Sequence, residues 1–195
     1  MIPRCIGRLA GVAALALLAS MPFGNTPAFA AGEVLKLGAP GLPPARGNPL
    51  QGLGPPTSYT WSAMFDAMTR IDETGNVAPE LAVGWKNMTP TTWHFSLRPN
   101  TKFSNGEPLN AQAIVDNILY LFTDEGKVTL TGRDLSQKFV TARAIDDLTV
   151  EIESVKPNPD VPREVMKMYV VAPKAWKNLG VEGFSAAPVG TGSYM

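Results

Sequence analysis

The chain has 195 residues, with 17 basic and 17 acidic side chains, a single histidine and a single cysteine. A formal net charge of zero provides no basic field for nucleic acid or for an anionic lipid surface. One cysteine excludes a disulfide scaffold, and the apolar share of 45% is that of an ordinary globular protein rather than a disordered one.

The first thirty residues have the order of a secretory signal peptide. Arg4 and Arg8 precede an apolar run, and the A-x-A sequence AFA ends at Ala30. Prolines and a glycine interrupt the run before it reaches the roughly 20 apolar residues of a transmembrane helix. We therefore expect a signal peptide over residues 1–30 with cleavage after Ala30. Cleavage would leave 15 of the 17 basic residues against all 17 acidic ones.

A short strand, EVLKLG at residues 33–38, follows the expected cleavage site. Residues 39–56 are so rich in proline and glycine that neither a helix nor a central strand fits them. A long irregular segment in a compact protein is often functional. This segment is either a loop that faces a ligand or a plain surface excursion.

Residues 58–71, SYTWSAMFDAMTRI, predict a helix capped by Ser58. Four large apolar residues share one face of that helix: Trp61, Met64, Phe65 and Met68. Core packing is the favoured interpretation of this face. Residues 72–77, DETGNV, predict a turn.

Residues 92–99, TWHFSLRP, alternate as a half-buried strand does. Trp93, Phe95 and Leu97 point to one face, so we expect them to be buried and His94 to lie on the opposite face. A turn at Asn105–Gly106 follows, and Asn110 is positioned to cap a helix. The expected buried stripe of that helix consists of Ile114, Ile118 and Leu121.

Residues 139–154 predict a β-hairpin with its turn at Asp146–Asp147. A short helix near residues 163–168, a strand at 169–173 and a helix at 174–180 follow, with Gly180 in the place of a C-terminal cap. In residues 188–195, PVGTGSYM, Gly190 and Gly192 predict a turn that leads into a strand at Ser193.

No reactive group of side chains is visible in the sequence. His94 has no serine in a G-x-S-x-G elbow to activate, and no cluster of His, Cys or carboxylate residues has the spacing of metal ligands. Turn chemistry explains Asp146 and Asp147. We expect no enzyme activity, no metal site and no cofactor.

The most specific pattern lies in residues 81–118, LAVGWKNMTPTTWHFSLRPNTKFSNGEPLNAQAIVDNI. It contains Trp85 after an LA-x-G step, an aromatic-alternating strand ending in Leu-Arg, and a Lys-Phe-x-Asn-Gly-x-Pro turn that opens a helix. IDETGNVAPELA precedes it, and AIDDLTVEIES, KPNP, VVAPKAW and PVGTGSY follow. In this order the segments resemble the family 5 extracellular solute-binding proteins, which are peptide-, dipeptide- and nickel-type receptors of ABC importers. Ser104, Ala113 and Ser193 depart from the family pattern and prevent a finer subfamily assignment.

The resemblance implies a mixed α/β (α+β) fold of the periplasmic-binding-protein-like type II kind, present in part. We expect the first strand and the cleft loop of lobe I over residues 31–58. An accessory α/β subdomain is expected over residues 59–170, and a return into lobe I over residues 171–195.

The resemblance also implies a function. A receptor of this kind captures peptides or similar small polar solutes in the periplasm and delivers them to the permease and ATPase subunits of an ABC importer. By analogy with the family, the ligand contacts of this chain are expected in and beside the cleft loop, at Leu42, Pro43, Asn48, Tyr59 and Trp61.

In the family the Gly-Thr-Gly-x-Tyr turn leads back into the first lobe, and the second lobe comes after it. We therefore expect the chain to be the N-terminal portion of a longer receptor. The alternative is a small secreted scaffold or interaction protein without a ligand cleft, or a non-functional truncation. The discriminating observation is whether the genomic sequence after codon 195 continues into a second lobe.

Overall fold

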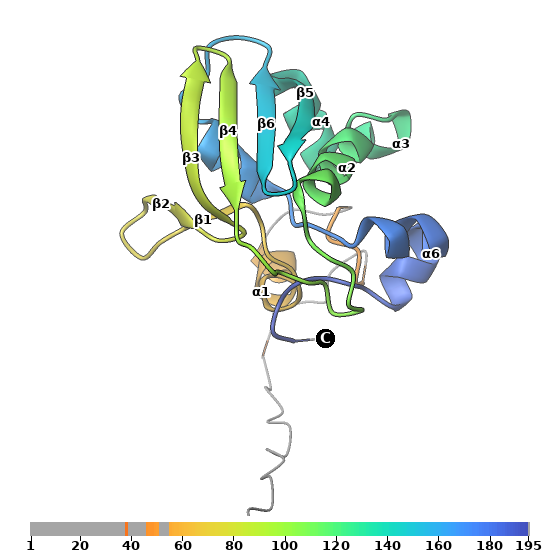
Figure 1. Cartoon of the computed structure of the whole chain (residues 1–195). Coiled ribbons are helices and arrows are strands. Elements are labelled where there is room, and N and C mark those ends of the chain that lie inside the picture. The colour runs from red at the N-terminus through yellow and green to blue at the C-terminus, as the bar shows by residue number, and fades with distance from the viewer. Residues whose placement is uncertain (1–37, 39–45, 51–54, 195) are drawn as a thin grey trace, which may run out of the picture. The chain divides into compact units, whose positions relative to one another are not determined.

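The computed structural model describes residue 38, residues 46–50 and residues 55–194 (Figure 1). The predicted signal peptide and the strand at 33–38 therefore lie outside the described residues, apart from Gly38, which is not in a strand. Residues 38–195 form one compact unit. No helix in the described part of the chain has both the length and the apolar character needed to cross a membrane.

A four-stranded antiparallel sheet is the centre of the fold, in the order β3-β4-β6-β5 (Figure 1). Its strands are β3 (Ala82–Thr89), β4 (Thr92–Leu97), β5 (Phe139–Asp146) and β6 (Thr149–Ser154). In β4, Phe95 and Leu97 are buried, as the alternation predicted, whereas Trp93, which was also expected to be buried, is only half-buried. Phe95 lies opposite Val150 and Trp93 opposite Ile152, so apolar side chains continue across the central pair of strands.

Both edge strands of this sheet contain two irregularities each. In β3 the register with β4 skips Val83 and Met88, and in β5 the register with β6 skips Val140 and Ile145. A skipped residue is the extra residue of a β-bulge, which bends the strand and interrupts its ladder. All four bulge residues are apolar and about half exposed.

The hairpin of β5 and β6 confirms the predicted pair of strands, but its turn is one residue later than expected. Asp147 and Leu148 form the turn, and the carboxylate of Asp146 accepts a hydrogen bond from the Leu148 N–H at 2.8 Å. An aspartate at the first position of a turn commonly makes this bond. Asp146, the last residue of β5, is therefore the residue that precedes the turn. The turn lies at Asp147–Leu148 instead of Asp146–Asp147.

Helix α2 (Ala111–Leu121) covers β5 and β6 and is followed by α3 (Asp124–Lys127) and α4 (Leu130–Lys138). The Asn110 side chain accepts a hydrogen bond from the Ala113 N–H, so the predicted cap is confirmed. The predicted stripe of Ile114, Ile118 and Leu121 is completely buried.

Helix α1 (Pro55–Met64) is earlier and shorter than the predicted helix at 58–71. Residues 66–68 leave the helix because their backbone pairs with other segments. The Ala67 carbonyl accepts from the Leu81 N–H at 3.1 Å, and Ala67 also bridges to Tyr169. Next come the short paired strands β1 (Thr69–Ile71) and β2 (Val77–Pro79), joined by the predicted turn. Long-range backbone pairing has overridden the helical pattern of this stretch.

The chain then forms α5 (Val161–Glu164), the 3₁₀ helix η1 (Val165–Lys167) and α6 (Pro173–Ala186). The predicted helix near 163–168 is thus present. The predicted strand at 169–173 is only the single bridge from Tyr169. Gly180, with φ of 65°, interrupts α6 where the sequence predicted an end, and a further helical turn continues beyond it.

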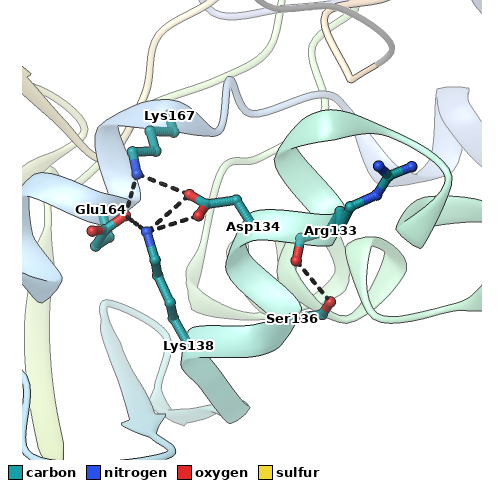
Figure 2. Close-up of polar contacts among 6 residues, drawn as sticks. All are labelled: Arg133, Asp134, Ser136, Lys138, Glu164 and Lys167. Carbon is teal, nitrogen blue, oxygen red and sulfur yellow. Dashed lines mark hydrogen bonds and ion pairs between the residues drawn. The ribbon is translucent and has the colours of Figure 1, made fainter.

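Four alternating charges connect α4 to α5 and η1 (Figure 2). Asp134 and Lys138 of α4 are paired with each other, and both also contact the pair of Glu164 and Lys167. Burial opposes the charge of Asp134, but hydrogen bonds from Lys138 and Lys167 outweigh it and lower the pKa of that carboxyl. The cluster balances its own charge, so it acts as a structural link between these helices.

Residues 188–194 form no strand, contrary to the prediction for Ser193 and Tyr194. They lie against α1 instead: the Gly192 N–H donates to the Met64 carbonyl at 3.0 Å and the Tyr194 N–H to the Ala63 carbonyl at 3.1 Å. A Cβ on Gly190 would sit 2.1 Å from the Met64 oxygen. The glycines at 190 and 192 permit this close approach and do not have a positive φ.

Candidate ligand-binding pocket

A pocket of about 190 Å³ lies between α2 and α6. Its described lining comes from three parts of the chain: Leu50, then Asp116, Asn117 and Tyr120 of α2, then Val171, Pro173, Trp176 and Lys177 at and before the start of α6. Leu50 belongs to the segment that the sequence singled out as a possible ligand-facing loop. The pocket therefore joins that segment to two helices that are far apart in the sequence.

Asn117 fixes the two helical walls of the pocket relative to each other. Its Nδ2 donates to the carbonyl oxygens of Ala113 at 2.8 Å and Val171 at 2.9 Å, and its Oδ1 accepts from the Val171 N–H at 2.9 Å. Every hydrogen-bonding site that matters on this buried amide is thereby used inside the protein. Asn117 therefore holds the two helical walls together, and its side chain is not available to a ligand.

Aromatic rings from both helices contribute to the lining of the pocket. Tyr120 and Trp176 meet edge to face with centroids 5.0 Å apart, and Trp176 meets Phe184 at 5.1 Å. Burial, with a further contribution from the nearby charge of Glu125, raises the pKa of Tyr120 to about 12. The phenol is therefore neutral at physiological pH, and it lies near the carboxylate of Glu125.

Two charged side chains at the pocket remain available. The Asp116 Oδ1 accepts a hydrogen bond from Gln112 Nε2 at 2.7 Å, which leaves its second oxygen without a partner among the described residues. Lys177 has no hydrogen bond or ion pair in the described part of the chain, and both side chains are exposed. The pocket thus combines an apolar and aromatic interior with one carboxylate oxygen and one ammonium that have no partner within the described ranges.

The site residues expected from the sequence fall into three situations. Leu42 and Pro43 lie outside the described residues. Trp61 is 1% exposed and its indole N–H donates to the Arg46 carbonyl at 3.0 Å, so it joins α1 to residues 46–50. Tyr59, by contrast, is 58% exposed on α1.

Asn48 is completely buried, and part of its hydrogen-bonding capacity is unused among the described residues. Its Oδ1 accepts from the Leu50 N–H at 3.0 Å, while its Nδ2 has no partner within residues 46–50 and 55–194. Whether these five residues contact a ligand stays a prediction.

Sequence reasoning missed the α2–α6 pocket. Asp116 and Tyr120 are separated by four positions and therefore share a helix face, but their partners Trp176 and Lys177 lie more than fifty residues later. No pattern of neighbouring residues in the sequence predicts such a contact. The motif VVAPKAW contains three of the lining residues, Val171, Pro173 and Trp176, but in the sequence it indicates only a family resemblance.

The contacts of His94 indicate a structural role. Its Nε2 lies 2.7 Å from Oε2 of Glu151, whose other oxygen is paired with Arg143. His94 lies on the face of β4 opposite Phe95, as predicted. No group of three or more His, Cys, Asp or Glu side chains that could hold a metal ion occurs among the described residues.

A family model matches residues 76–195: the bacterial extracellular solute-binding proteins of family 5, described as the middle part of that family. Among curated proteins, the nickel-binding periplasmic protein of Escherichia coli (strain K12) is 26% identical over 153 residues. That match covers 72% of this chain and 27% of the relative. The chain spans about a quarter of the length of the curated relatives that it matches.

Solved structures show the same partial fold. The oligopeptide-binding protein AppA of Bacillus subtilis, in complex with a nonapeptide, matches with a TM-score of 0.67 at 16% identity, covering 80% of this chain and 32% of that one. The ABC transporter-associated periplasmic binding protein DppA of Helicobacter pylori, in complex with the peptide STSA, matches with a TM-score of 0.64 at 15% identity, covering 74% and 33%. At these identities the likeness concerns the fold: the mixed α/β architecture matches part of periplasmic peptide-binding proteins.

Proposed function

Because the chain belongs to the bacterial extracellular solute-binding proteins of family 5, we propose that it is the substrate-binding component of an ABC importer. In this role it captures peptides or similar small polar solutes in the periplasm and delivers them to a membrane permease and its ATPase. The family is one of solute-binding proteins and not of enzymes, in agreement with the prediction from the sequence.

The observation that carries the proposal is the match of the family model over residues 76–195. The likeness to two peptide-bound proteins adds a fold that is compatible with peptide ligands. Within the chain, the α2–α6 pocket offers an apolar interior with a few polar groups, which is the usual composition of a small-molecule site. These three observations agree on a binding protein.

We propose a division of the chain as expected from the resemblance: residues 31–58 and 171–195 in the first lobe of a type II periplasmic-binding-protein-like fold, and residues 59–170 in an accessory subdomain. Support comes from the contact between residues 66–67 and residues 169–170, which lie near the start and the end of the proposed subdomain. Ala67 bridges to Tyr169, and the Val170 N–H donates to the Asp66 carbonyl at 2.9 Å. Paired crossing segments of this kind are suitable places for a hinge between two bodies.

The periplasmic location is also a proposal for this chain. It is supported by the charge and apolar order of residues 1–30 and by the similarity to periplasmic binding proteins. N-terminal sequencing of the protein from a periplasmic extract tests it. A first residue at Ala31 is expected, and a cytoplasmic protein starting at Met1 would reject export.

Uptake of labelled peptides by the source bacterium tests the proposed function. We expect a strain that lacks the gene to take up a mixture of labelled di- to pentapeptides more slowly than the parent, and a plasmid copy to restore the rate. A plasmid copy without residues 1–30 is the matched control, because it lacks only the proposed export signal. Unchanged uptake in the deletion strain would favour the alternative, an interaction protein without a ligand cleft.

A further inference from the structure

Two of the described side chains that line the α2–α6 pocket are charged, and neither charge has an ion-pair partner among the described residues. Asn117 is committed to Ala113 and Val171, and Tyr120 is a neutral phenol near Glu125. The unused groups are the second carboxylate oxygen of Asp116 and the ammonium of Lys177.

These two charges have opposite sign and come from opposite walls of the pocket. Asp116 is on α2 and Lys177 on α6, and no ion pair within 4.0 Å joins them in the described part of the chain. A neutral apolar ligand would leave both charges without a partner, and a ligand with one charge would satisfy one and repel the other. A dipolar ion complements both.

The size and the interior of the pocket narrow the class of ligand further. A volume of about 190 Å³ is below the roughly 300–1,000 Å³ that is typical of pockets for drug-sized ligands. The occupant is therefore small, of the order of a single amino acid rather than an oligopeptide. Leu50, Val171 and Pro173, with the ring of Trp176, offer an apolar surface for its side chain.

We propose that the α2–α6 pocket binds a free α-amino acid with an aliphatic side chain. Asp116 accepts hydrogen bonds from its ammonium, Lys177 donates to its carboxylate, and Trp176 packs against its side chain. This assignment rests on the proposed solute-binding function and names the chemistry of one site within it.

The test is an NMR titration of the purified chain with L-leucine, observed at the indole N–H signal of Trp176. The variant Trp176→Phe identifies that signal among the four tryptophans. We expect a saturable shift with L-leucine. Isocaproate, which lacks the ammonium, and isoamylamine, which lacks the carboxylate, should each bind about tenfold more weakly, because each loses a charge-assisted contact.

Variants of the two charged residues provide the second arm. Asp116→Asn and Lys177→Gln should each weaken L-leucine binding about tenfold. Lys174→Gln is the matched control, because Lys174 is an exposed lysine of the same helix that is not part of the described pocket lining. Circular dichroism of each variant confirms that the fold is intact, which is expected since both charged side chains are exposed.

Three outcomes would overturn the assignment: no saturable shift with L-leucine, equal binding of all three ligands, or full affinity in both charge variants. Peptide uptake by cells is an independent readout. If uptake depends on the gene while L-leucine fails to bind, the assignment of the pocket is wrong and the proposed function stands. If L-leucine binds as expected while uptake is independent of the gene, the proposed importer function is the one that fails.

Discussion

The side chain of Asn117 makes hydrogen bonds to both the N–H and the carbonyl of Val171, each 2.9 Å long. A single amide thus holds the backbone that leads into α6 against the middle of α2. We expect Asn117→Ala to lower the free energy of unfolding by about 2–4 kcal/mol, because it leaves the buried backbone groups of Val171 without partners. Urea denaturation measures the loss.

The control for this prediction is Gln112→Ala, an exposed residue one turn earlier on the same helix, which should change stability by no more than about 0.5 kcal/mol. If the two variants had equal stability, the bonds of Asn117 to Val171 would contribute nothing to the attachment of α6.

Glu80 makes the stability of the fold depend on pH. Burial, with a further contribution from the charge of Asp66, raises the pKa of the Glu80 carboxyl to about 7, although its Oε2 accepts a hydrogen bond from the Ala67 N–H at 3.0 Å. Since the folded pKa lies above the unfolded one of 4.5, the folded state binds the proton more tightly. The stabilisation that comes from this tighter proton binding is fully present below the unfolded pKa. It is lost as the pH rises through about 7.

We therefore expect Glu80→Gln to remove that part of the pH dependence, since glutamine keeps an oxygen for Ala67 and has no charge. Partial exposure of Glu80 reduces the effect. The free energy of unfolding of the variant should therefore be about 1–2 kcal/mol higher than that of the wild type at pH 8, and equal to it at pH 4. Urea unfolding across this range measures the difference. Glu73→Gln, on the exposed turn after β1, should follow the wild type. Parallel curves for the wild type and Glu80→Gln would contradict the prediction.

Phe95 and His94 are neighbours in β4 with opposite roles. Phe95 is completely buried and contacts Trp85 with ring centroids 6.3 Å apart, whereas His94 is on the other face beside Glu151. Phe95→Ala should cost about 3–5 kcal/mol through the cavity that it creates. His94→Ala should cost about 1 kcal/mol or less, as expected for a partly exposed pair. A comparable loss in both, measured by urea denaturation, would mean that the two faces of β4 contribute equally.

Gly190 lies in close contact with the C-terminal end of α1. Because a Cβ at this position would overlap the Met64 carbonyl, Gly190→Ala should displace residues 188–194 and lower stability by about 1–3 kcal/mol. Amide hydrogen exchange at Gly192 and Tyr194, which donate to α1, should become faster. Gly84→Ala is the matched control, since a Cβ there meets nothing within 4 Å. Unchanged exchange in Gly190→Ala would show that the segment does not depend on this approach.

Local patterns were sufficient for several parts of the fold. The alternation of β4 and the cap of α2 at Asn110 depend on residues adjacent in the sequence, and the structure confirms both. The end of α1 was not predictable in this way, because residues 66–68 are drawn into pairing with the chain near Leu81 and Tyr169. Their apolar residues fit a helix equally well, so only the distant partners decide.

The candidate site was less predictable than the fold. The family resemblance predicts ligand contacts at residues that include Asn48 and Trp61, whereas the structure uses the indole of Trp61 to hold residues 46–50. The α2–α6 pocket depends on the contact of Tyr120 with Trp176, which only the folded chain brings together. A pocket formed by distant segments leaves no periodic signal in the sequence.

The bulges at Val83, Met88, Val140 and Ile145 have a consequence for the behaviour of this protein at high concentration. A regular edge strand is a template on which a second molecule can add its own strand and begin a fibre. Here both outer strands are interrupted twice, so an incoming strand finds no long run of evenly spaced donors and acceptors. The sheet is thus protected against growth from either side, even though apolar side chains are exposed along both edges.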